Sequence, residues 1–352
     1  MNPAEAVLPL HIRADADDAA IAAFVRAHPD GTPFHLPAWL DAIEAGTGQR
    51  AHMLVAERAG RIEGVLPLTA IRSMLFGKAM VSSGFAVGGG VLASDAAVAD
   101  ALLEAGWVLA ETLGCPSLEL RGGTSPSGAG WQHKTDSHAG FVRPLAADDD
   151  AELKAVPRKQ RAEVRKALAA DLTVETGTAP ADRAAHYAVY AESVRNLGTP
   201  VFPKRLFAAV LDCFGEDADI LTVRHGGKPI ASVLSLYHNG TVMPYWGGGT
   251  LEARTMRANE LMYFALMRHA RGRGCTGFDF GRSKFGTGAF AYKKNWGFEP
   301  QPLAYAVRTA DGAEAREVNP LSPKYRAQIA VWKKLPLWLA NRLGPPLARG
   351  LG

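Results

Sequence analysis

The chain has 352 residues, of which 47% are hydrophobic and 21% charged, values that are ordinary for globular proteins and leave room for about two domains. A formal net charge of +4 is too small to identify a nucleic-acid-binding protein, and no uncharged apolar run reaches the roughly 18 residues of a membrane-spanning helix. The three cysteines are too far apart for a zinc site, and the N-terminus lacks an export signal. We therefore expect a cytoplasmic protein with reduced thiols, no metal and no bound cofactor. His133 and His138, in a loop rich in glycine and serine, are expected to be ordinary surface residues.

Residues 1–147 predict a first α/β domain in which two helices precede a hairpin. The hairpin consists of two β-rich segments joined by a short turn, and the next strand should end at a cluster of glycines. Asp95 can cap a following helix, and Gly114 can end it. In chain order, the expected elements are helices over 17–27 and 38–45, strands over 53–58 and 62–71, a strand ending at residue 88, a helix over 95–113 and a strand over 118–120.

Residues 148–312 predict a second domain of the same kind, which follows the acidic run Asp148–Asp150. It opens with a basic helix and then repeats the scheme of hairpin, strand, helix and strand. The expected elements are a helix over 157–168, a hairpin over 220–237, a strand to residue 246, a helix over 255–271, a strand over 278–280, a helix over 289–296 and a strand over 303–307.

Three short segments of the first domain return in the second, in the same order and about 160 residues later. The matched segments are 65–68 with 233–236, 88–92 with 247–251, and 114–120 with 274–280. A fixed order at domain length predicts two copies of one α/β unit, and chance matching of glycine-rich turns is the alternative. The order of strands and helices is typical of the acetyltransferase (GNAT) unit, because the hairpins break the alternation of a doubly wound sheet. We predict two tandem GNAT-like domains with mixed, mainly antiparallel sheets flanked by helices, and a substrate between them.

Three arginines of the basic helix, Arg158, Arg161 and Arg165, are spaced to lie on one helix face. A row of guanidinium groups can hold a phosphate or carboxylate through paired hydrogen bonds. The alternative is a solvated charged face. We predict that these arginines orient an anionic substrate.

The segment Met243–Gly249 combines two aromatic residues with three glycines. Glycines let a ligand approach the backbone, and free amide N–H groups can polarise a carbonyl. The alternatives are a loop that needs positive φ angles and, for Tyr245 and Trp246, a place in the core. We predict that Tyr245 and Trp246 bind substrate.

The densest candidate site is the segment 278–298. Asp279 stands between two phenylalanines, and burial would raise its proton affinity, as a general base for an ammonium group requires. Gly286-Thr287-Gly288, ahead of a helix, offers backbone amides to an anion, and Lys293 and Lys294 add positive charge. We predict that Asp279 accepts the proton of an incoming amine and that Lys293 stabilises the tetrahedral oxyanion or a phosphate group next to it.

Residues 30–310 resemble the FemAB-like peptidyl- and acyltransferases, which carry tandem GNAT-like domains. The resemblance rests on the duplication, the arginine-rich start of the second copy and the closing segment. The motifs Asp279–Ser283 and Lys293–Phe298 look most like those of FemAB-related proteins from PEP-CTERM/exosortase and exopolysaccharide clusters. In the better-understood relatives an aromatic–lysine pair lies in the active site, which implies that Tyr292 and Lys293 are catalytic. Those relatives have phenylalanine before the lysine.

The resemblance implies an N-acyltransferase that passes an activated acyl or aminoacyl group to an amine on an anionic cell-envelope, peptidoglycan or exopolysaccharide precursor. The co-substrate would be acyl-CoA or aminoacyl-tRNA. A typical GNAT enzyme seats the CoA diphosphate on a glycine turn, and the corresponding residues 250–258 lack those glycines. The basic helix would suit tRNA, yet the coiled-coil arm of several such transferases is absent. The alternative from another class is a non-catalytic relative that docks a polysaccharide or exosortase assembly at the membrane.

The predicted site residues thus have two roles. Those predicted to be catalytic are Asp279, Tyr292 and Lys293. Those predicted to bind substrate are Arg158, Arg161, Arg165, Tyr245, Trp246, Arg282, Lys284 and Lys294.

Residues 313–352 form a basic, amphipathic tail. From Pro323 onward it has no acidic residue, and it carries Lys324, Arg326, Lys333, Lys334, Arg342 and Arg349 together with Trp332 and Trp338. This mixture is typical of peripheral contact with the inner face of a membrane or with another polyanion. The alternative is a tail that packs its tryptophans on its own domain.

Overall fold

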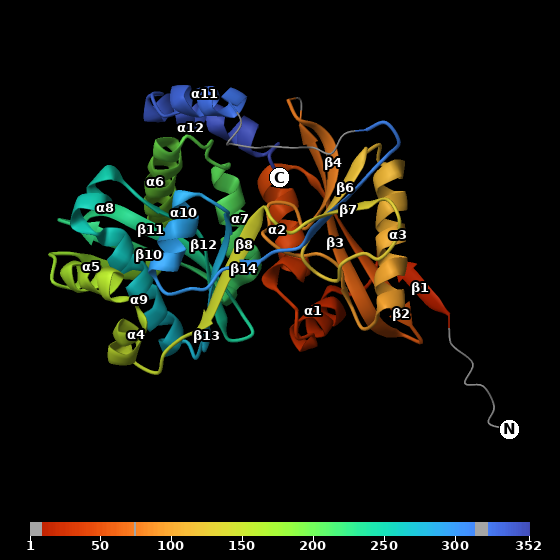
Figure 1. Cartoon of the computed structure of the whole chain (residues 1–352), viewed down its shortest axis with the longest axis horizontal. Coiled ribbons are helices and arrows are strands. Elements are labelled where there is room, and N and C mark those ends of the chain that lie inside the picture. Colours follow the sequence, from red (N-terminus) through yellow and green to blue (C-terminus); the bar gives the residue numbers. More distant parts are fainter. Residues whose placement is uncertain (1–8, 74, 314–322) are drawn as a thin grey trace.

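The computed structural model describes residues 9–73, 75–313 and 323–352, apart from the side chains of 323–326. The start of the predicted tail at 314–322 and the side chains of Lys324 and Arg326 therefore lie outside the described part. Two α/β lobes are each built around one mixed sheet (Figure 1). Among the helices that the structure describes, none is both long enough and apolar enough to cross a membrane.

The first sheet is antiparallel except for one parallel pair, β4 with β6. Its strands, in spatial order, are β1 (Leu10–Arg13), β2 (Arg50–Arg58), β3 (Arg61–Ser73), β4 (Gly77–Ser82), β6 (Ser117–Arg121), β15 (Tyr305–Thr309) and β7 (Trp131–Lys134), with β5 (Leu92–Ala93) beside β3. Helix α3 (Ala96–Thr112) covers one face, and α1 (Asp18–Ala27), the 3₁₀ turn η1 (Pro33–His35) and α2 (Pro37–Thr47) cover the other. Because successive side chains of a strand point to opposite faces, Val65 of β3 joins the α1–α2 core and Leu66 joins the α3 core.

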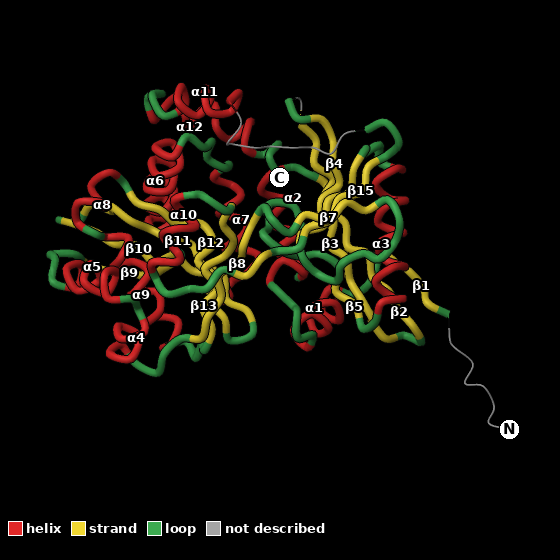
Figure 2. Tube along the Cα trace, in the orientation of Figure 1, coloured by secondary structure: helices red, strands yellow, loops and turns green. Residues whose placement is uncertain are grey.

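The second sheet has the order β14 (Gln301–Pro302), β8 (His138–Pro144), β13 (Gly277–Lys284), β12 (Thr241–Gly249), β11 (Lys228–His238), β10 (Ala218–His225) and β9 (Thr173–Gly177). Helices α6 (Pro180–Leu197) and α7 (Lys204–Phe214) cover one face, and α5 (Arg158–Leu168) and α9 (Ala258–Gly272) cover the other (Figure 2). The remaining elements of this lobe are α4 (Asp149–Ala155), η2 (Gly215–Asp217), α8 (Leu251–Met256) and α10 (Gly288–Asn295).

Both lobes repeat one order of elements: two helices, three antiparallel strands, a helix, and a strand parallel to the third. In each lobe the parallel pair is held together over only two residue pairs, 80–118 and 81–119 in the first lobe and 241–277 and 242–278 in the second. The prediction of two tandem GNAT-like domains with mixed, mainly antiparallel sheets is confirmed. Both predicted hairpins are present as β2–β3 and β10–β11.

The sheets exchange strands across the residues proposed as domain boundaries. β8 precedes residue 148 but pairs with β13 of the second sheet, and β15 precedes residue 312 but pairs with β6 of the first. The repeated segments mark only the strands that the two copies share. They carry no information on which sheet takes the edge strands that follow each copy.

One continuous core joins the lobes. Helix α2 packs on α7, and Trp39 of α2 stacks on Trp246 of β12 with ring centroids 6.1 Å apart. Phe207 of α7 meets the same Trp246 ring edge-on at 4.8 Å. These contacts are apolar and buried on both sides, so they fix how the second sheet sits against the first.

The helix expected over 255–271 is interrupted at Arg257, where φ is 57° and α8 ends before α9 begins. The left-handed turn lets the Arg257 side chain form an ion pair with Glu163 of α5. In the tail, α11 (Pro323–Trp332) and α12 (Leu337–Ala348) lie over α6 at one end of the second lobe (Figure 1).

Candidate active site

A distortion of β13 positions the candidate site. The pairing of β13 with β8 shifts register between Asp279 and Arg282, and Gly281 inside the shift has a φ of 70°. Only glycine adopts such a φ without strain, so the glycine of the Asp-Phe-Gly-Arg-Ser motif is required by the backbone. Helix α10 then returns over β13, which places Lys293 beside Gly281.

Asp279 is a half-buried carboxylate that accepts a backbone hydrogen bond. Its Oδ1 accepts a hydrogen bond from the Gly281 backbone N–H at 2.8 Å. Burial raises the pKa of Asp279 above its usual value, while the Gly281 N–H and the positive charge of Lys293 act against this rise. A carboxylate with raised proton affinity is the property that we predicted for a general base.

Lys293 is mostly buried, and its Nζ donates a hydrogen bond to the Arg282 carbonyl at 2.8 Å. The same atom lies 5.5 Å from the ring centroids of both Phe141 and Phe280. Burial lowers the pKa of Lys293 from 10.5 to about 8; Asp279 opposes this shift and Arg282 adds to it. The structure thus brings Asp279 and Lys293 close enough for their charges to interact, with Asp279 Oδ1 on the Gly281 N–H and Lys293 Nζ on the Arg282 carbonyl.

Open space borders the backbone between these two groups. A Cβ atom built on Gly281 would have only the Lys293 Nζ within 4 Å, at 3.9 Å. The Gly281 position therefore leaves room for a methyl-sized group beside the Lys293 ammonium.

Tyr292 lies next to Lys293 but points elsewhere. Its hydroxyl is 3.5 Å from Glu260 Oε1 of α9, and its ring packs near Tyr263 and Trp296. Burial raises the pKa of Tyr292 well above its usual value, so the phenol stays protonated. Burial likewise raises the pKa of Glu260. The Tyr292 ring therefore belongs to an aromatic cluster with Tyr263, Phe280 and Trp296.

Arg282 connects the site to the first lobe. Its Nη1 donates to the Tyr305 hydroxyl of β15 at 2.7 Å, and that hydroxyl donates to the Val87 carbonyl at 3.2 Å. Arg121 at the end of β6 is only 7% exposed; its Nη1 donates to the Ala86 carbonyl at 3.0 Å. Both guanidinium groups therefore face the loop that follows β4.

His138, which we expected on the surface, is half-buried between the lobes. Its ring lies 5.6 Å from that of Tyr305. The pKa of His138 is lowered to about 4, and burial is the largest cause. The nearby cations Arg282, Lys284 and Arg121 act in the same direction, and Glu119 opposes them. The expectation was wrong because His138 belongs to β8, whose place in the second sheet cannot be read from its own sequence. His133 lies in β7 of the first sheet and is exposed.

Arg121, His138 and Tyr305 are site neighbours that sequence reasoning missed. Arg121 follows a predicted strand directly and precedes two glycines, and an arginine at a strand end before a glycine turn is the signal that could have drawn attention to it. His138 and Tyr305 lie near the site only because β8 pairs with the second sheet and β15 pairs with the first. Lys284 adds positive charge near His138, whereas Lys294 is exposed on α10.

Tyr245 and Trp246 lie in the core that joins the lobes. Trp246 is 6% exposed, and the Tyr245 hydroxyl donates to the Phe85 carbonyl at 2.6 Å. The glycines after them belong to β12, and none of Gly247–Gly249 has a positive φ. A Cβ on Gly248 would overlap Ser193 of α6, and one on Gly249 would lie 2.6 Å from Asn259 Oδ1. Here the glycines serve close helix packing on the sheet.

The arginines of α5 do not contact the Asp279–Lys293 pair in the described residues. Arg161 donates to the Lys154 and Val156 carbonyls and so closes the turn before its own helix, while Arg158 and Arg165 are exposed. The amides at the start of α10 are partly used as well, because the Thr287 N–H donates to the Lys284 carbonyl at 3.4 Å and the Phe290 N–H donates to the Thr287 hydroxyl at 3.3 Å.

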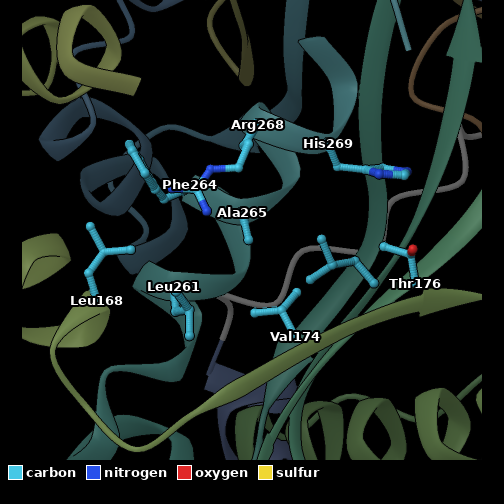
Figure 3. Close-up of a pocket in the computed structure, with 9 residues that line it drawn as sticks. Leu168, Val174, Thr176, Leu261, Phe264, Ala265, Arg268 and His269 are labelled. Atoms are coloured by element: carbon cyan, nitrogen blue, oxygen red, sulfur yellow. The ribbon is translucent and has the colours of Figure 1, made fainter. Parts of the chain in front are cut away.

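A cavity of about 250 Å³ lies on another face of the second lobe. Figure 3 shows Leu168, Val174 and Leu261, from α5, β9 and α9, arranged around it. The α9 residues that line it form one helix stripe, and Tyr263, which faces the site, lies outside that stripe. Among the described residues, no group of three or more His, Cys, Asp or Glu side chains could hold a metal ion.

Comparison with known proteins agrees with this architecture. Residues 155–294 match the protein-family model described as an acetyltransferase (GNAT) domain. The fold is similar to that of FemX, with 17% identity, 84% of this chain and 96% of that chain covered, and a TM-score of 0.67.

Two further solved structures have the same fold. One is a tandem GNAT protein from the clavulanic acid biosynthesis pathway, at 16% identity, 87% and 100% coverage and a TM-score of 0.53. The other is the C-terminal domain of a protein described as a lysylphosphatidylglycerol synthetase from Agrobacterium fabrum, at 14% identity, 83% and 91% coverage and a TM-score of 0.57. No curated protein matches the chain. The chain is therefore a tandem GNAT-like protein in fold, and its second lobe, which carries Asp279 and Lys293, is the part that matches the acetyltransferase domain.

Proposed function

We propose that the protein is an N-acyltransferase whose reaction centre is the Asp279–Lys293 pair. The observation that carries the proposal is that a half-buried carboxylate and a half-buried ammonium both lie beside Gly281, where no side chain fills the space. The match of the second lobe to an acetyltransferase domain supports the same reaction class.

In this reaction an amine nitrogen attacks the carbonyl carbon of an activated acyl group. The amine is protonated at neutral pH and must lose a proton before it can attack. Asp279 accepts this proton, because its raised pKa makes it a stronger base than a solvated aspartate. Lys293, protonated at neutral pH, stabilises the negative oxygen of the tetrahedral intermediate. The bond to the leaving group then breaks with its electron pair, and the cationic nitrogen of the intermediate gives up its extra proton. That proton goes to the leaving group, and the neutral amide remains.

The donor would be an acyl-CoA or an aminoacyl-tRNA. In place of a glycine turn, residues 250–258 form α8 and the left-handed Arg257, whose guanidinium is held by Glu163. This segment offers a diphosphate few free donors. We therefore propose that the donor is an aminoacyl-tRNA or a CoA thioester held in a way that differs from a typical GNAT enzyme.

The acceptor would be an amine on an anionic envelope precursor of the peptidoglycan, exopolysaccharide or PEP-CTERM type. Arg282, which lies half-buried where the lobes meet, is nearer to the Asp279–Lys293 pair than Arg158, Arg161 and Arg165 of α5, whereas Arg121 forms an ion pair with Glu119. Buried guanidinium groups bind phosphate and carboxylate strongly because little water competes. We also propose that the tail brings the protein to the inner face of the membrane, where such a precursor would be held.

The test is to incubate the purified protein with envelope precursors and either labelled acyl-CoA or labelled aminoacyl-tRNA pools, and to analyse the precursors by mass spectrometry. Transfer of label from one pool supports the proposal and identifies the donor. No transfer from either pool, together with binding of the precursor, would favour the non-catalytic docking role. Calorimetry with CoA alone is an independent check, because tight binding would contradict the account of residues 250–258.

A further inference from the structure

Helix α12 of the tail has a packed face made of small residues. Ala340, Gly344 and Ala348 are buried and recur at intervals of four residues, so they form one stripe. A Cβ on Gly344 would lie 3.0 Å from the Val201 backbone nitrogen, which shows how closely the helix approaches the second lobe. The packing fixes which side of α12 faces outward.

The outward stripe of α12 combines one large aromatic side chain with positive charge. Trp338, Arg342, Pro346 and Arg349 are all exposed and fall on one side of the helix at offsets of 4, 8 and 11 residues. Trp338 is 69% exposed, although tryptophan is mostly buried in globular proteins.

Neighbouring residues extend this stripe into a surface. Val331 at the end of α11 is 65% exposed, and Lys333 and Lys334 in the following turn are exposed too. We call Val331, Lys333, Lys334, Trp338, Arg342 and Arg349 the tail surface. Residues 327–352 contain no aspartate or glutamate, and below the turn Arg195 of α6 donates to the Lys333 carbonyl at 3.3 Å.

The tail surface is held firmly against both lobes. Beyond α12 the chain reaches the first lobe, where Gln49 Nε2 donates to the Arg349 carbonyl and Arg121 Nη2 donates to the Gly352 carbonyl, both at 2.8 Å. Figure 1 shows α11 and α12 over α6 and the C-terminal end of the chain beside α2. The surface therefore has a defined orientation relative to the site.

We infer that the tail surface binds an anionic lipid membrane. A tryptophan at the interface of headgroups and acyl chains, in a segment that carries lysine and arginine side chains and no acidic residue, has the chemistry of a peripheral membrane anchor. A second copy of the chain fits less well, because two such positive surfaces would repel each other. A nucleic acid would use the cations but leaves Trp338 and Val331 without an apolar partner. The inference rests on the proposed place at the membrane and not on the transfer reaction.

The experiment is co-sedimentation of the full chain with large vesicles of phosphatidylcholine alone or with 30% phosphatidylglycerol. We expect binding to the anionic vesicles and little to the neutral ones. The double variant K333Q/K334Q should weaken binding about 25-fold, at about fivefold for each charge removed near an anionic surface. W338A should also weaken it, and W338F should lose part of the fluorescence blue shift that vesicles cause in the parent protein.

Matched controls separate the tail surface from general charge and hydrophobicity. R61Q/K159Q has the same net charge change at exposed sites outside the tail, and V108A removes an exposed apolar side chain from α3. Both should bind vesicles like the parent. Equal binding to neutral and anionic vesicles, unchanged binding of W338A, self-association that depends on Trp338, or binding to tRNA without binding to vesicles would each overturn the inference. Acyl transfer is measured separately and with soluble acceptors, so its loss would not be mistaken for loss of membrane binding.

Discussion

At the scale of single residues, Lys293, which we propose to be catalytic, is held in the site at a cost in stability. Its ammonium is buried against two phenyl rings and has one backbone carbonyl as hydrogen-bond partner. Burial disfavours the charged form, which is why its pKa falls to about 8. A cation that lowers stability by being poorly solvated is typical of a functional site rather than of a structural one.

The pH dependence of turnover follows from these two groups. Transfer requires Asp279 deprotonated and Lys293 protonated, so we expect a bell-shaped profile of kcat/KM. The alkaline limb should fall near pH 8, and the acidic limb should lie above the usual pKa of an aspartate, because burial raises the pKa of Asp279. In K293R the alkaline limb should move upward out of the measurable range. An unchanged alkaline limb in K293R would exclude Lys293 as the titrating acid.

Replacing Lys293 by methionine should stabilise the protein while abolishing transfer. The folded-state pKa of Lys293 is lowered, so the folded chain binds fewer protons than the unfolded chain between about pH 8 and 10.5, and the penalty is fully present below pH 8. We expect K293M to gain about 1–2 kcal/mol in urea unfolding at pH 7, with the gain shrinking as the pH rises through that window. K294M, at an exposed neighbour, should change neither stability nor its pH dependence.

At the scale of elements, the glycine run of β12 decides how close two helices come to the second sheet. Gly248 faces Ser193 of α6 and Gly249 faces Asn259 of α9, and neither leaves room for a methyl group. The strand therefore tolerates glycine, which is otherwise unfavourable inside a strand, because the packing requires it.

G248A should destabilise the protein by about 2–4 kcal/mol, because the added methyl group overlaps Ser193 in a packed interior. Thermal and urea unfolding measure this loss, and S193G in the same chain should restore part of it. G272A is the matched control: a Cβ on Gly272 at the end of α9 meets nothing within 4 Å, so the change should be neutral or mildly stabilising. Equal effects of the two alanine variants would contradict the packing account.

The same elements show how much the sequence could predict. The Asp-Phe-Gly-Arg-Ser and Tyr-Lys motifs are local, so their strand, turn and helix could be placed from residue patterns, and their proximity follows from a helix that returns over the strand before it. The glycines after Trp246 were ambiguous, since a ligand contact and a helix contact require the same absence of a side chain. The environment of His138 could not be predicted, because it depends on pairing with residues about 140 positions later.

At the scale of the whole molecule, the two copies are not independent units. They share a core built around Trp39 and Trp246, and each sheet borrows a strand from outside its own repeat. Cutting the chain between the copies would expose one edge of β13, the strand that carries Asp279. The molecule therefore consists of two lobes of one fold, and the exchanged strands β8 and β15 connect them next to the candidate site.

A fragment comprising residues 148–312 should therefore not fold, because it lacks β8 and the first-lobe side of the shared core. We expect low solubility and no cooperative thermal transition for this fragment, whereas the full chain should unfold in one transition. W39A, which removes an aromatic ring between the lobes, should lower the stability of the full chain by about 3–5 kcal/mol without splitting that transition. Two separate transitions, or a folded fragment, would show that the lobes are independent.

The reaction centre itself is tested most directly by single-turnover transfer with D279N and K293A, using whichever donor pool labels an envelope precursor. We predict that each variant slows transfer at least about 100-fold, while its affinity for the donor stays within about threefold of the parent. D171N and K159A, at exposed positions, serve as controls and should transfer like the parent. Transfer by D279N or K293A at the parental rate would contradict the assignment of these two residues and with it the proposed reaction centre.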